Sequence, residues 1–365
     1  MSAAVIVIVV AVRGCTGSRV TTSLAGGAPV VATVELPTEM CGWYFIAQVH
    51  VNGAGPYDMM LDTGMQLTQI TPDAAEGAGV RGAIRTLRIG DLEIEGRVPC
   101  RVRSLETLSQ ALGRPIDGIL AHDVFADVLL TYDFPGEAVR VSGGRIDSGG
   151  AGVVPTGGGP RPFVRAAVDG RTIPVLIDTG SSRGLTLQNI DAFELGSGPE
   201  PTGARVRLDG VHHVHSGRLA DDVAFGPLTL IRPIVHESVS VNLIGQVYLR
   251  DFVLTFDQRA DLCLIESPAG MLDAPLPSEP ILGMGVAMKP CDRGLEVQSI
   301  FSGGPAEAAG VHVGDVVVAV NGVTVLDRGC VERTREPAVP SIVVLSIERG
   351  ADSFDLDVER VVLVP

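Results

Sequence analysis

The stretches that decide the fold are Val51-Asn-Gly-Ala-Gly-Pro-Tyr-Asp-Met-Met-Leu-Asp-Thr-Gly64 and Val168-Asp-Gly-Arg-Thr-Ile-Pro-Val-Leu-Ile-Asp-Thr-Gly180. Each begins with an Asx-Gly pair that suits a tight hairpin turn, continues as an apolar strand and ends in Asp-Thr-Gly. Farther along the chain, Leu129-Leu-Thr-Tyr-Asp133 matches Val253-Leu-Thr-Phe-Asp257 in the same order. The sequence therefore contains two copies of one β-rich unit of roughly 110 residues.

The composition excludes several classes of function. The chain has 365 residues and a formal net charge of −15, from 28 Lys and Arg residues against 43 Asp and Glu residues. An acidic chain without a basic block is not expected to bind nucleic acid, and an aromatic content of 4% argues against base stacking. The apolar fraction of 45% is enough to build hydrophobic cores. We therefore expect a turn-rich protein of several domains.

Local signals within the first copy predict strands with one helical exception. The pair Gly90-Asp91 is a second hairpin turn signal between apolar runs. Leu105, Leu108 and Leu112 fall on one face of a short helix. Ser104 precedes that helix and can cap it. The leucine stripe is expected to belong to the core and not to a functional site.

Two apolar strands that each end in Asp-Thr-Gly, at matching repeat positions, resemble the two lobes of an aspartic peptidase. The similarity covers approximately residues 40–266, and it resembles most the bacterial retropepsin-like aspartyl proteases with both lobes on one chain. The resemblance implies a mainly β fold of two tandem β-barrel lobes, with Asp62 and Asp178 as the catalytic pair. It also implies that the active-site loops are supported by Thr63, Gly64, Thr179, Gly180 and Ser181.

Two facing carboxyl groups supply the chemistry that peptide hydrolysis needs. They cannot both ionise at short distance, so they share one proton. The ionised member can take a proton from water as a general base, while the protonated member polarises the peptide carbonyl. The residue after each motif differs, Met65 in one copy and Ser181 in the other. Because a hydroxyl can hydrogen-bond a carboxylate and methionine cannot, we expect Asp178 to be the more readily ionised partner.

The second copy carries about twenty residues that the first copy lacks. They include Arg207-Leu-Asp-Gly-Val-His-His-Val-His-Ser-Gly217, where the resemblance places a flap that closes over substrate. We therefore expect a single flap, on the second lobe, containing Gly210, Val211, His212 and His213. Histidines at a hairpin tip are expected to be solvated or to face substrate, and the spacing places too few ligands for zinc. We expect no metal site and no cofactor.

The chain changes character after a proline-rich segment at residues 267–279. Gly304-Pro-Ala-Glu-Ala-Ala-Gly310, followed by Gly-Asp and Asn-Gly pairs, resembles a bacterial PDZ domain over approximately residues 280–365. PDZ modules add a peptide strand to a sheet edge and capture a terminal carboxylate. The alternative is a packing domain that rigidifies the protease lobes, because Pro280 offers no N–H to a carboxylate. The resemblance places the carboxylate loop at Ile281, Leu282, Gly283 and Met284.

The first residues resemble an export signal. Ala3–Val12 is an unbroken apolar run that is too short to span a bilayer. Val12-Arg-Gly-Cys15 also resembles a bacterial lipoprotein signal, whose cysteine is lipidated after cleavage, although Arg13 departs from that pattern. We expect export to the cell envelope, in the periplasm or with a membrane tether through Cys15. A cytoplasmic protein that begins with a simple strand is the alternative.

The six cysteines leave their redox state open. In an oxidising compartment, Cys41 with Cys100 and Cys291 with Cys330 would each close a loop within one domain. In a reducing compartment, all would be core thiols. Cys263 stands between two leucines and is expected to be a buried apolar residue.

The sequence therefore divides into six segments. They are a signal at 1–20, linkers at 21–39 and 267–279, protease lobes at 40–147 and 148–266, and a PDZ domain at 280–365. The expected function is an aspartic endopeptidase that hydrolyses peptide bonds through a water-activating Asp pair, with a PDZ module that binds or positions polypeptide substrates. The alternative is a catalytically silent protease-like scaffold whose PDZ domain binds peptides, including peptide C-termini.

Overall fold

The computed structural model describes most of the chain. It covers residues 18–365 except 158, 208–209, 239, 269, 271, 273, 327–329 and 331–338, and it gives only the backbone of residues 204–213. Cys15 and the rest of the expected signal up to residue 17 lie outside the described residues. None of the helices in the described part of the chain has the length and apolarity of a membrane-spanning segment.

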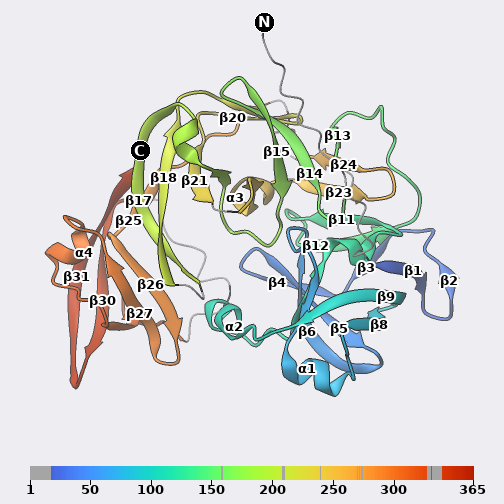
Figure 1. Cartoon of the computed structure of the whole chain (residues 1–365), viewed down its shortest axis with the longest axis horizontal. Helices are drawn as coiled ribbons and strands as arrows, with labels where there is room; N and C mark the ends of the chain where they lie inside the picture. The colour runs from blue at the N-terminus through green and yellow to red at the C-terminus, as the bar shows by residue number, and fades with distance from the viewer. Residues whose placement is uncertain are drawn as a thin grey trace, which may run out of the picture.

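The first half of the chain forms a nine-stranded sheet that we call the lobe-one sheet (Figure 1). Its strand order is β2-β1-β9-β7-β10-β6-β5-β4, and β8 pairs with β5 and β9. The elements of this half are β1 (Arg19–Leu24), β2 (Ala28–Pro29), β3 (Val34–Leu36), β4 (Thr38–Cys41), β5 (Tyr44–Val51), β6 (Ala54–Asp62), β7 (Thr68–Ile70), α1 (Pro72–Gly77), β8 (Ala83–Ile89), β9 (Leu92–Val102), α2 (Glu106–Leu112), β10 (Gly118–Ala121), η1 (His122–Phe125), β11 (Leu129–Asp133) and β12 (Ala138–Ser142).

The second half repeats this architecture in a second nine-stranded sheet, the lobe-two sheet. Its strand order is β17-β18-β21-β16-β22-β15-β14-β19-β20. The elements of this half are β13 (Val153–Pro155), β14 (Phe163–Val168), β15 (Arg171–Ile177), β16 (Leu185–Gln188), η2 (Ile190–Ala192), β17 (Leu195–Arg207), β18 (Gly210–Leu219), β19 (Val223–Phe225), β20 (Leu228–Leu230), β21 (Ile234–Ser238), β22 (Leu243–Ile244), α3 (Gln246–Leu249), β23 (Val253–Asp257) and β24 (Leu262–Glu266).

A six-stranded sheet joins the two halves, in the order β13-β24-β23-β11-β12-β3. Its two central strands come one from each half, and Thr131 lies directly opposite Thr255. The hydroxyls of these two threonines are 2.9 Å apart. Tyr132 is fully buried beside them, with its ring 6.2 Å from that of Phe256 and 5.9 Å from that of Phe45. The repeat in the sequence therefore becomes an approximate twofold relation between the halves.

The two Asx-Gly turns determine which residues of each half meet. Asn52 and Asp169 both adopt positive φ angles, 49° and 48°, and the glycine after each does the same. Two successive positive φ angles define the hairpin turn whose twist matches the flanking strands. The turns fix the registers of β5 on β6 and of β14 on β15, and both second strands run directly into Asp-Thr-Gly.

The expected linker at residues 21–39 is wrong. β1 pairs with β9 over six residues, β3 forms the outer strand of the six-stranded sheet, and β4 pairs with β5. Leu36 is buried at 2% exposure in the main core. Strands that form only by pairing with distant residues have short and weakly periodic sequences, so local pattern does not reveal them.

The helix expected around residues 104–112 is confirmed as α2. Leu105 and Leu112 are buried together with Cys41, and Leu108 packs against the same cluster. The Ser104 hydroxyl accepts a hydrogen bond from the N–H of Glu106 at 3.2 Å.

The C-terminal residues form a separate sheet with its own core. Its strand order is β25-β31-β30-β28-β27-β26, and β29 pairs with β28. A helix begins at Pro305, and the chain leaves it through Gly310 at a φ of 82°. Its elements are β25 (Ile281–Gly283), β26 (Val286–Cys291), β27 (Gly294–Ile300), α4 (Pro305–Ala308), β28 (Val316–Val320), β29 (Val323–Thr324), β30 (Ser341–Arg349) and β31 (Asp352–Val364).

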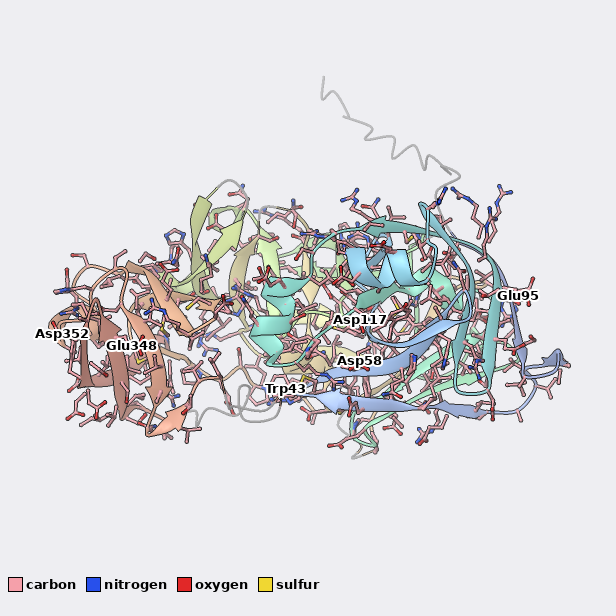
Figure 2. All side chains as sticks on the ribbon, turned by 90° about the horizontal axis from the view of Figure 1, so that it is seen from below. Trp43, Asp58, Glu95, Asp117, Glu348 and Asp352 are labelled. Carbon is pink, nitrogen blue, oxygen red and sulfur yellow. A yellow bond between two sulfur atoms is a disulfide. The ribbon has the colours of Figure 1, made fainter. Side chains whose placement is uncertain are left out.

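The C-terminal module packs against both lobes. Figure 2 shows Glu348 and Asp352 of the module at one end of the molecule and Glu95 of lobe one at the other. α2 contacts β26, and the amide of Gln110 donates to Asp292 at 3.0 Å. β17 of lobe two contacts both β26 and β31. The module therefore touches the expected flap as well as lobe one.

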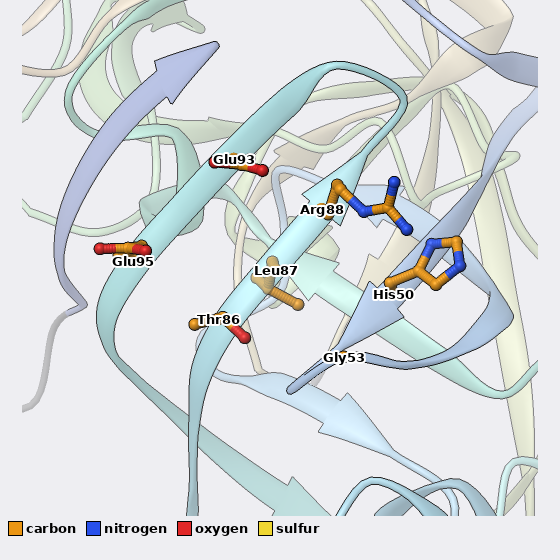
Figure 3. Close-up of a pocket in the computed structure, with 7 residues that line it drawn as sticks. All are labelled: His50, Gly53, Thr86, Leu87, Arg88, Glu93 and Glu95. Atoms are coloured by element: carbon orange, nitrogen blue, oxygen red, sulfur yellow. The ribbon is translucent and has the colours of Figure 1, made fainter. Parts of the chain in front are cut away.

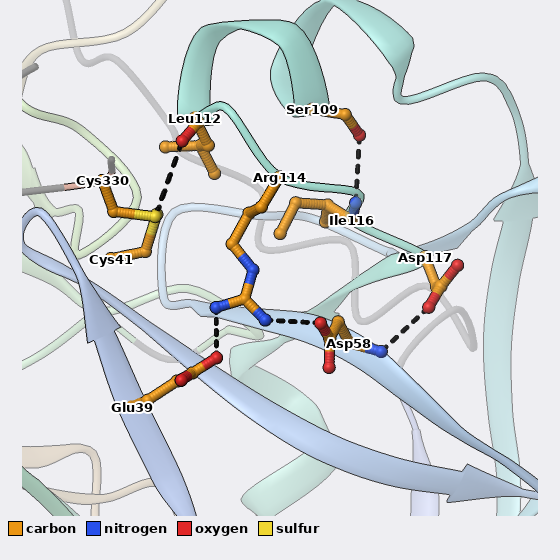
Figure 4. A network of polar contacts seen from close by, with 9 residues as sticks. All are labelled: Glu39, Cys41, Asp58, Ser109, Leu112, Arg114, Ile116, Asp117 and Cys330. Atoms are coloured by element: carbon orange, nitrogen blue, oxygen red, sulfur yellow. Dashed lines mark hydrogen bonds and ion pairs between the residues drawn. A yellow bond between two sulfur atoms is a disulfide. The ribbon is translucent and has the colours of Figure 1, made fainter. Parts of the chain in front are cut away.

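The expected disulfide pairings are wrong. Cys41 is bonded to Cys330, 289 residues away, while Cys100 and Cys291 are free thiols. The Leu112 carbonyl at the end of α2 lies against the two sulfur atoms (Figure 4). The pairing could not be found within single domains because it joins lobe one to the C-terminal module. Cys263 is fully buried as expected.

Peptide mapping of the oxidised protein tests this pairing. We expect a Cys41–Cys330 cross-linked peptide, with Cys100, Cys263 and Cys291 alkylated after denaturation without reductant. The Cys41→Ser variant should free Cys330 and lower the free energy of unfolding by about 2–4 kcal/mol, because the cross-link restricts the unfolded chain. Cys100→Ser is the matched control. A Cys41–Cys100 or Cys291–Cys330 peptide would contradict the docked arrangement.

Candidate active site

Two loops, one from each lobe, meet across the twofold axis through their threonines. The backbone N–H of Thr63 donates to the hydroxyl of Thr179, and the N–H of Thr179 donates to the hydroxyl of Thr63, both at 3.0 Å. The hydroxyl of Thr63 in turn donates to the carbonyl of Ile177 at 2.7 Å. Both threonines are almost fully buried. Each loop thus supplies hydrogen-bond partners to the buried polar groups of the other loop.

The two aspartate side chains cross over to the partner loop. A Cβ atom on Gly64 would overlap the carboxyl group of Asp178, and a Cβ atom on Gly180 would overlap that of Asp62. Each carboxylate also accepts the N–H of the glycine in its own loop, at 2.7 Å for Asp62 and 3.0 Å for Asp178. Glycine is required at both positions because any side chain would occupy the space of a carboxyl group. The structure therefore brings Asp62, Thr63, Gly64, Asp178, Thr179 and Gly180 together.

Burial and mutual repulsion keep a proton on the pair. Burial and then the negative charge of Asp62 raise the pKa of Asp178 from 3.8 to about 8. Burial also raises the pKa of Asp62, but hydrogen bonds from Gly64, Asp178, Met65 and Gly180 oppose this rise. The two carboxyl groups titrate as a pair, and the raised pKa values favour a pair that holds one proton.

The expected order of ionisation stays a prediction. We expected the Ser181 hydroxyl to favour the charged form of Asp178, and in the structure that hydroxyl accepts the N–H of Arg183 at 3.4 Å. Backbone N–H groups of Met65 and Gly180 lower the pKa of Asp62 in addition to that of Gly64. The Met65 sulfur accepts the amide of Gln69 at 3.0 Å. Backbone donors thus favour the charged form of Asp62 as well.

Two strand neighbours of the aspartates were missed in the sequence. Ile46 lies opposite Met60, so the register places Tyr44 opposite Asp62. By the same rule, Phe163 lies opposite Leu176, and the N–H of Ile177 donates to the carbonyl of Pro162 at 3.0 Å, which places Arg161 opposite Asp178. Residues directly opposite in an antiparallel pair have neighbouring side chains. Counting back from the Asp169-Gly170 turn would have found Arg161, but the irregularity between Val49 and Val51 shifts the register of β5 by one residue, so the same count in lobe one gives Trp43 instead of Tyr44.

The Tyr44 side chain spans the two lobes. Its hydroxyl is hydrogen-bonded to Ser182, two residues beyond Gly180. Burial raises the pKa of Tyr44, and the charges of Asp178 and Asp62 raise it further. Tyr44 therefore remains a neutral hydrogen-bonding group beside the pair.

Lobe two also holds the turn that precedes Tyr44. The fully buried Gln246 donates its amide to the carbonyl of Trp43 at 2.8 Å and to the carbonyl of Thr179. The guanidinium of Arg250 lies over the Trp43 ring, 4.5 Å from its centre. The start of β5 is thus fixed to the same loop that carries Asp178.

An ion-pair network fixes β4 to the catalytic strand β6 (Figure 4). Arg114 bridges Glu39 on β4 and Asp58 on β6. Asp117 accepts the N–H of Asp58 at 2.9 Å. The network lies beside the Cys41–Cys330 bond and holds the hairpin that carries Trp43.

The long hairpin expected in lobe two is present as β17 and β18. Its pairing extends to Arg207 opposite Gly210, so Gly210, Val211, His212 and His213 lie at its tip. Their side chains lie outside the described residues. In lobe one the chain passes from α1 directly to β8 through residues 78–82, without such a hairpin. The arrangement is therefore asymmetric, and the closing role of the hairpin stays a prediction.

The expected carboxylate loop of the C-terminal module lies at the edge of its sheet. Ile281, Leu282 and Gly283 form β25 and pair with β31. The Met284 carbonyl accepts the N–H of Ala306 at 2.8 Å and so covers the start of α4. The four residues are partly exposed, and what they bind stays a prediction.

Other candidate sites lie away from the aspartates. A surface pocket lined by His50, Arg88 and Glu93 is formed by β5, β8 and β9, and no residue of the aspartate loops lines it (Figure 3). Among the described residues, no group of three or more His, Cys, Asp or Glu side chains is arranged to hold a metal ion.

Comparison with known proteins identifies one domain and one partial similarity. Residues 283–359 match the family model of the PDZ domain, so the C-terminal module is a PDZ domain. No curated protein matches the chain. The PDZ domain of HtrA3 bound to a phage-derived ligand (FGRWV) is 21% identical, with a TM-score of 0.17, and the match covers 22% of this chain and 86% of that one. A retropepsin-like aspartic protease from Rickettsia conorii is 22% identical, with a TM-score of 0.25, over 31% of this chain and 96% of that one.

Removing one hydroxyl of the reciprocal threonine bonds should destabilise the lobe interface. Thr179→Val leaves the buried N–H of Thr63 without an acceptor, which costs about 1–3 kcal/mol of unfolding free energy. Chemical denaturation measures this change. Thr131→Val is the control, because its hydroxyl meets only the Thr255 hydroxyl. An equal loss of unfolding free energy in both variants would show that the bond between Thr63 and Thr179 stabilises the protein no more than the contact between Thr131 and Thr255.

The raised pKa of Asp178 should make the protein less stable as pH rises. A buried carboxyl with a folded-state pKa of about 8 holds its proton where the unfolded chain, at 3.8, has lost it. The folded state then binds more protons, so stability falls between about pH 4 and pH 8. Asp178→Asn removes this titration, and its gain in Tm over the parent protein should increase across that window. A gain independent of pH would contradict the assignment.

Proposed function

We propose that the two lobes form an aspartic endopeptidase whose catalytic residues are Asp62 and Asp178. The observation that carries the proposal is the crossed placement of the two carboxyl groups over Gly64 and Gly180. A decayed site would not require glycine at both positions. The reciprocal bonds of Thr63 support the proposal because they hold the two loops in one geometry.

The positions of the N–H donors assign a role to each carboxyl group. Asp62, favoured in its charged form, would take a proton from the attacking water. Asp178, which keeps its proton up to about pH 8, would donate it to the oxygen of the scissile peptide and polarise the carbonyl. When the tetrahedral intermediate collapses, a proton returns to the departing amine. The net reaction consumes one water molecule and breaks one peptide bond.

The PDZ domain would bind polypeptides close to the flap. PDZ modules bind extended peptides at a sheet edge. β26 is the outermost strand of its sheet and contacts both α2 and β17, so a peptide bound at this edge would lie beside the hairpin of lobe two. Peptide C-termini are the proposed ligands of the loop at Ile281–Gly283 and Met284. Location in the cell envelope is part of the proposal, since disulfides persist in oxidising compartments.

Digestion of an unfolded polypeptide tests the proposed activity. We expect the protein to cleave reduced, alkylated α-lactalbumin, with kcat/KM falling above about pH 8 as Asp178 loses its proton. Asp62→Asn and Asp178→Asn should each lower kcat/KM by at least about 10³-fold, because either change removes a proton acceptor or donor. Product analysis by mass spectrometry measures both effects.

Asp73→Asn is the matched control, since Asp73 is exposed at the start of α1. It should retain full activity. If the parent protein cleaves nothing between pH 3 and pH 9 but binds peptides through its PDZ domain, the chain is a catalytically silent scaffold. Cleavage that persists unchanged in both aspartate variants would belong to a contaminant.

A further inference from the structure

The approximate twofold symmetry does not extend to the charges of the side chains beside the two aspartates. Tyr44 begins β5 and lies beside the two aspartates, whereas Arg161 lies in the bend before β14, next to Pro162, whose carbonyl accepts the N–H of Ile177. The lobe-one position carries a neutral hydroxyl that is already hydrogen-bonded to Ser182. The lobe-two position carries a permanent positive charge. The two sides of the site therefore offer different chemistry to a peptide.

The Arg161 side chain is held in place and remains partly exposed. Its guanidinium lies over the Phe163 ring, 5.1 Å from the ring centre. Among the described residues, no carboxylate lies within ion-pair distance of this guanidinium. Its charge nevertheless acts on Asp178. The Arg161 guanidinium thus lies near Asp178 and has no ion-paired carboxylate among the described residues.

Among the described residues, Arg161 is one of several arginines without an ion-paired carboxylate, and it lies beside Asp178. The protein carries 43 acidic residues against 28 basic ones, and other arginines pair with them. The planar guanidinium offers a fork of N–H groups that matches a carboxylate.

We propose that Arg161 is a specificity-determining residue that binds a carboxylate of the substrate, an Asp or Glu side chain close to the scissile peptide bond. The proposal rests on the proposed peptidase activity. Because Tyr44 is neutral, the preference applies to one side of the scissile bond and is absent at the equivalent position on the other side. The preferred substrates are therefore polypeptides with an acidic residue on the side that faces lobe two.

A peptide series measures this preference. A cleavage site found in reduced, alkylated α-lactalbumin is made as a neutral peptide, and Glu or Gln is placed in turn at each of three positions on either side of the bond. The parent protein should cleave one Glu peptide about tenfold faster in kcat/KM than its Gln counterpart, as expected for a charge-assisted hydrogen bond. The mirror-related Glu peptide should show no such gain.

Variants of Arg161 separate its charge from its packing. Arg161→Gln should cleave the Glu and Gln peptides equally, Arg161→Lys should retain most of the preference, and Arg161→Glu should prefer a Lys peptide at the same position. A purely structural role would lower all rates together and would not invert the preference. Arg165→Gln is the matched control, because Arg165 is exposed on the same strand and lies opposite Pro174.

The outcomes distinguish this proposal from the peptidase assignment. If the parent protein cleaves the neutral peptide but shows no preference for Glu, or if Arg161→Gln keeps the preference, the role of Arg161 is overturned and the peptidase activity stands. If the parent protein cleaves no peptide of the series or of the unfolded protein, both proposals fall. A preference lost in Arg161→Gln and inverted in Arg161→Glu establishes the carboxylate site.

Discussion

The reciprocal hydrogen bonds between Thr63 and Thr179 are the constraint on which the site depends. They can form only if two loops from distant parts of the chain approach each other across an axis with nearly identical backbones. The approach excludes water and requires glycine beside each carboxyl group. The crowding of two carboxyl groups then follows, and so does the proton that they retain. The shared proton is thus a consequence of how the lobes are joined.

The two halves are related by approximate twofold symmetry, but the groups around the two aspartates differ. Both aspartates have a glycine N–H donor, but Asp62 has further backbone donors, and the pKa of Asp178 is raised to about 8. The neighbouring side chains differ in charge, Tyr44 on one side and Arg161 on the other. Lobe two carries the long hairpin of β17 and β18, while lobe one passes from α1 directly to β8. A peptide held between such lobes would meet different groups on its two sides.

The PDZ domain is part of the same assembly. The Cys41–Cys330 bond joins it to the strand before Trp43, and Gln246 holds that turn to the loop that carries Asp178. The domain also contacts β17, the first strand of the expected flap. One covalent bond and one hairpin thus connect the PDZ domain to the lobes that carry the aspartate pair.

The sequence by itself determined the repeat, the Asx-Gly turns, the two Asp-Thr-Gly loops, the α2 leucine stripe and the C-terminal module, because each depends on residues close together in the chain. It also contained, in the register of β14 on β15, the position of Arg161, but the irregularity in β5 hid the position of Tyr44. It failed on the strands of residues 21–39 and on the partner of Cys41. Both are decided by contacts between distant segments. Only the tertiary structure determines which strand edges pair with residues 21–39 and which sulfur lies next to that of Cys41. It also determines how many N–H groups donate to each of the two aspartates.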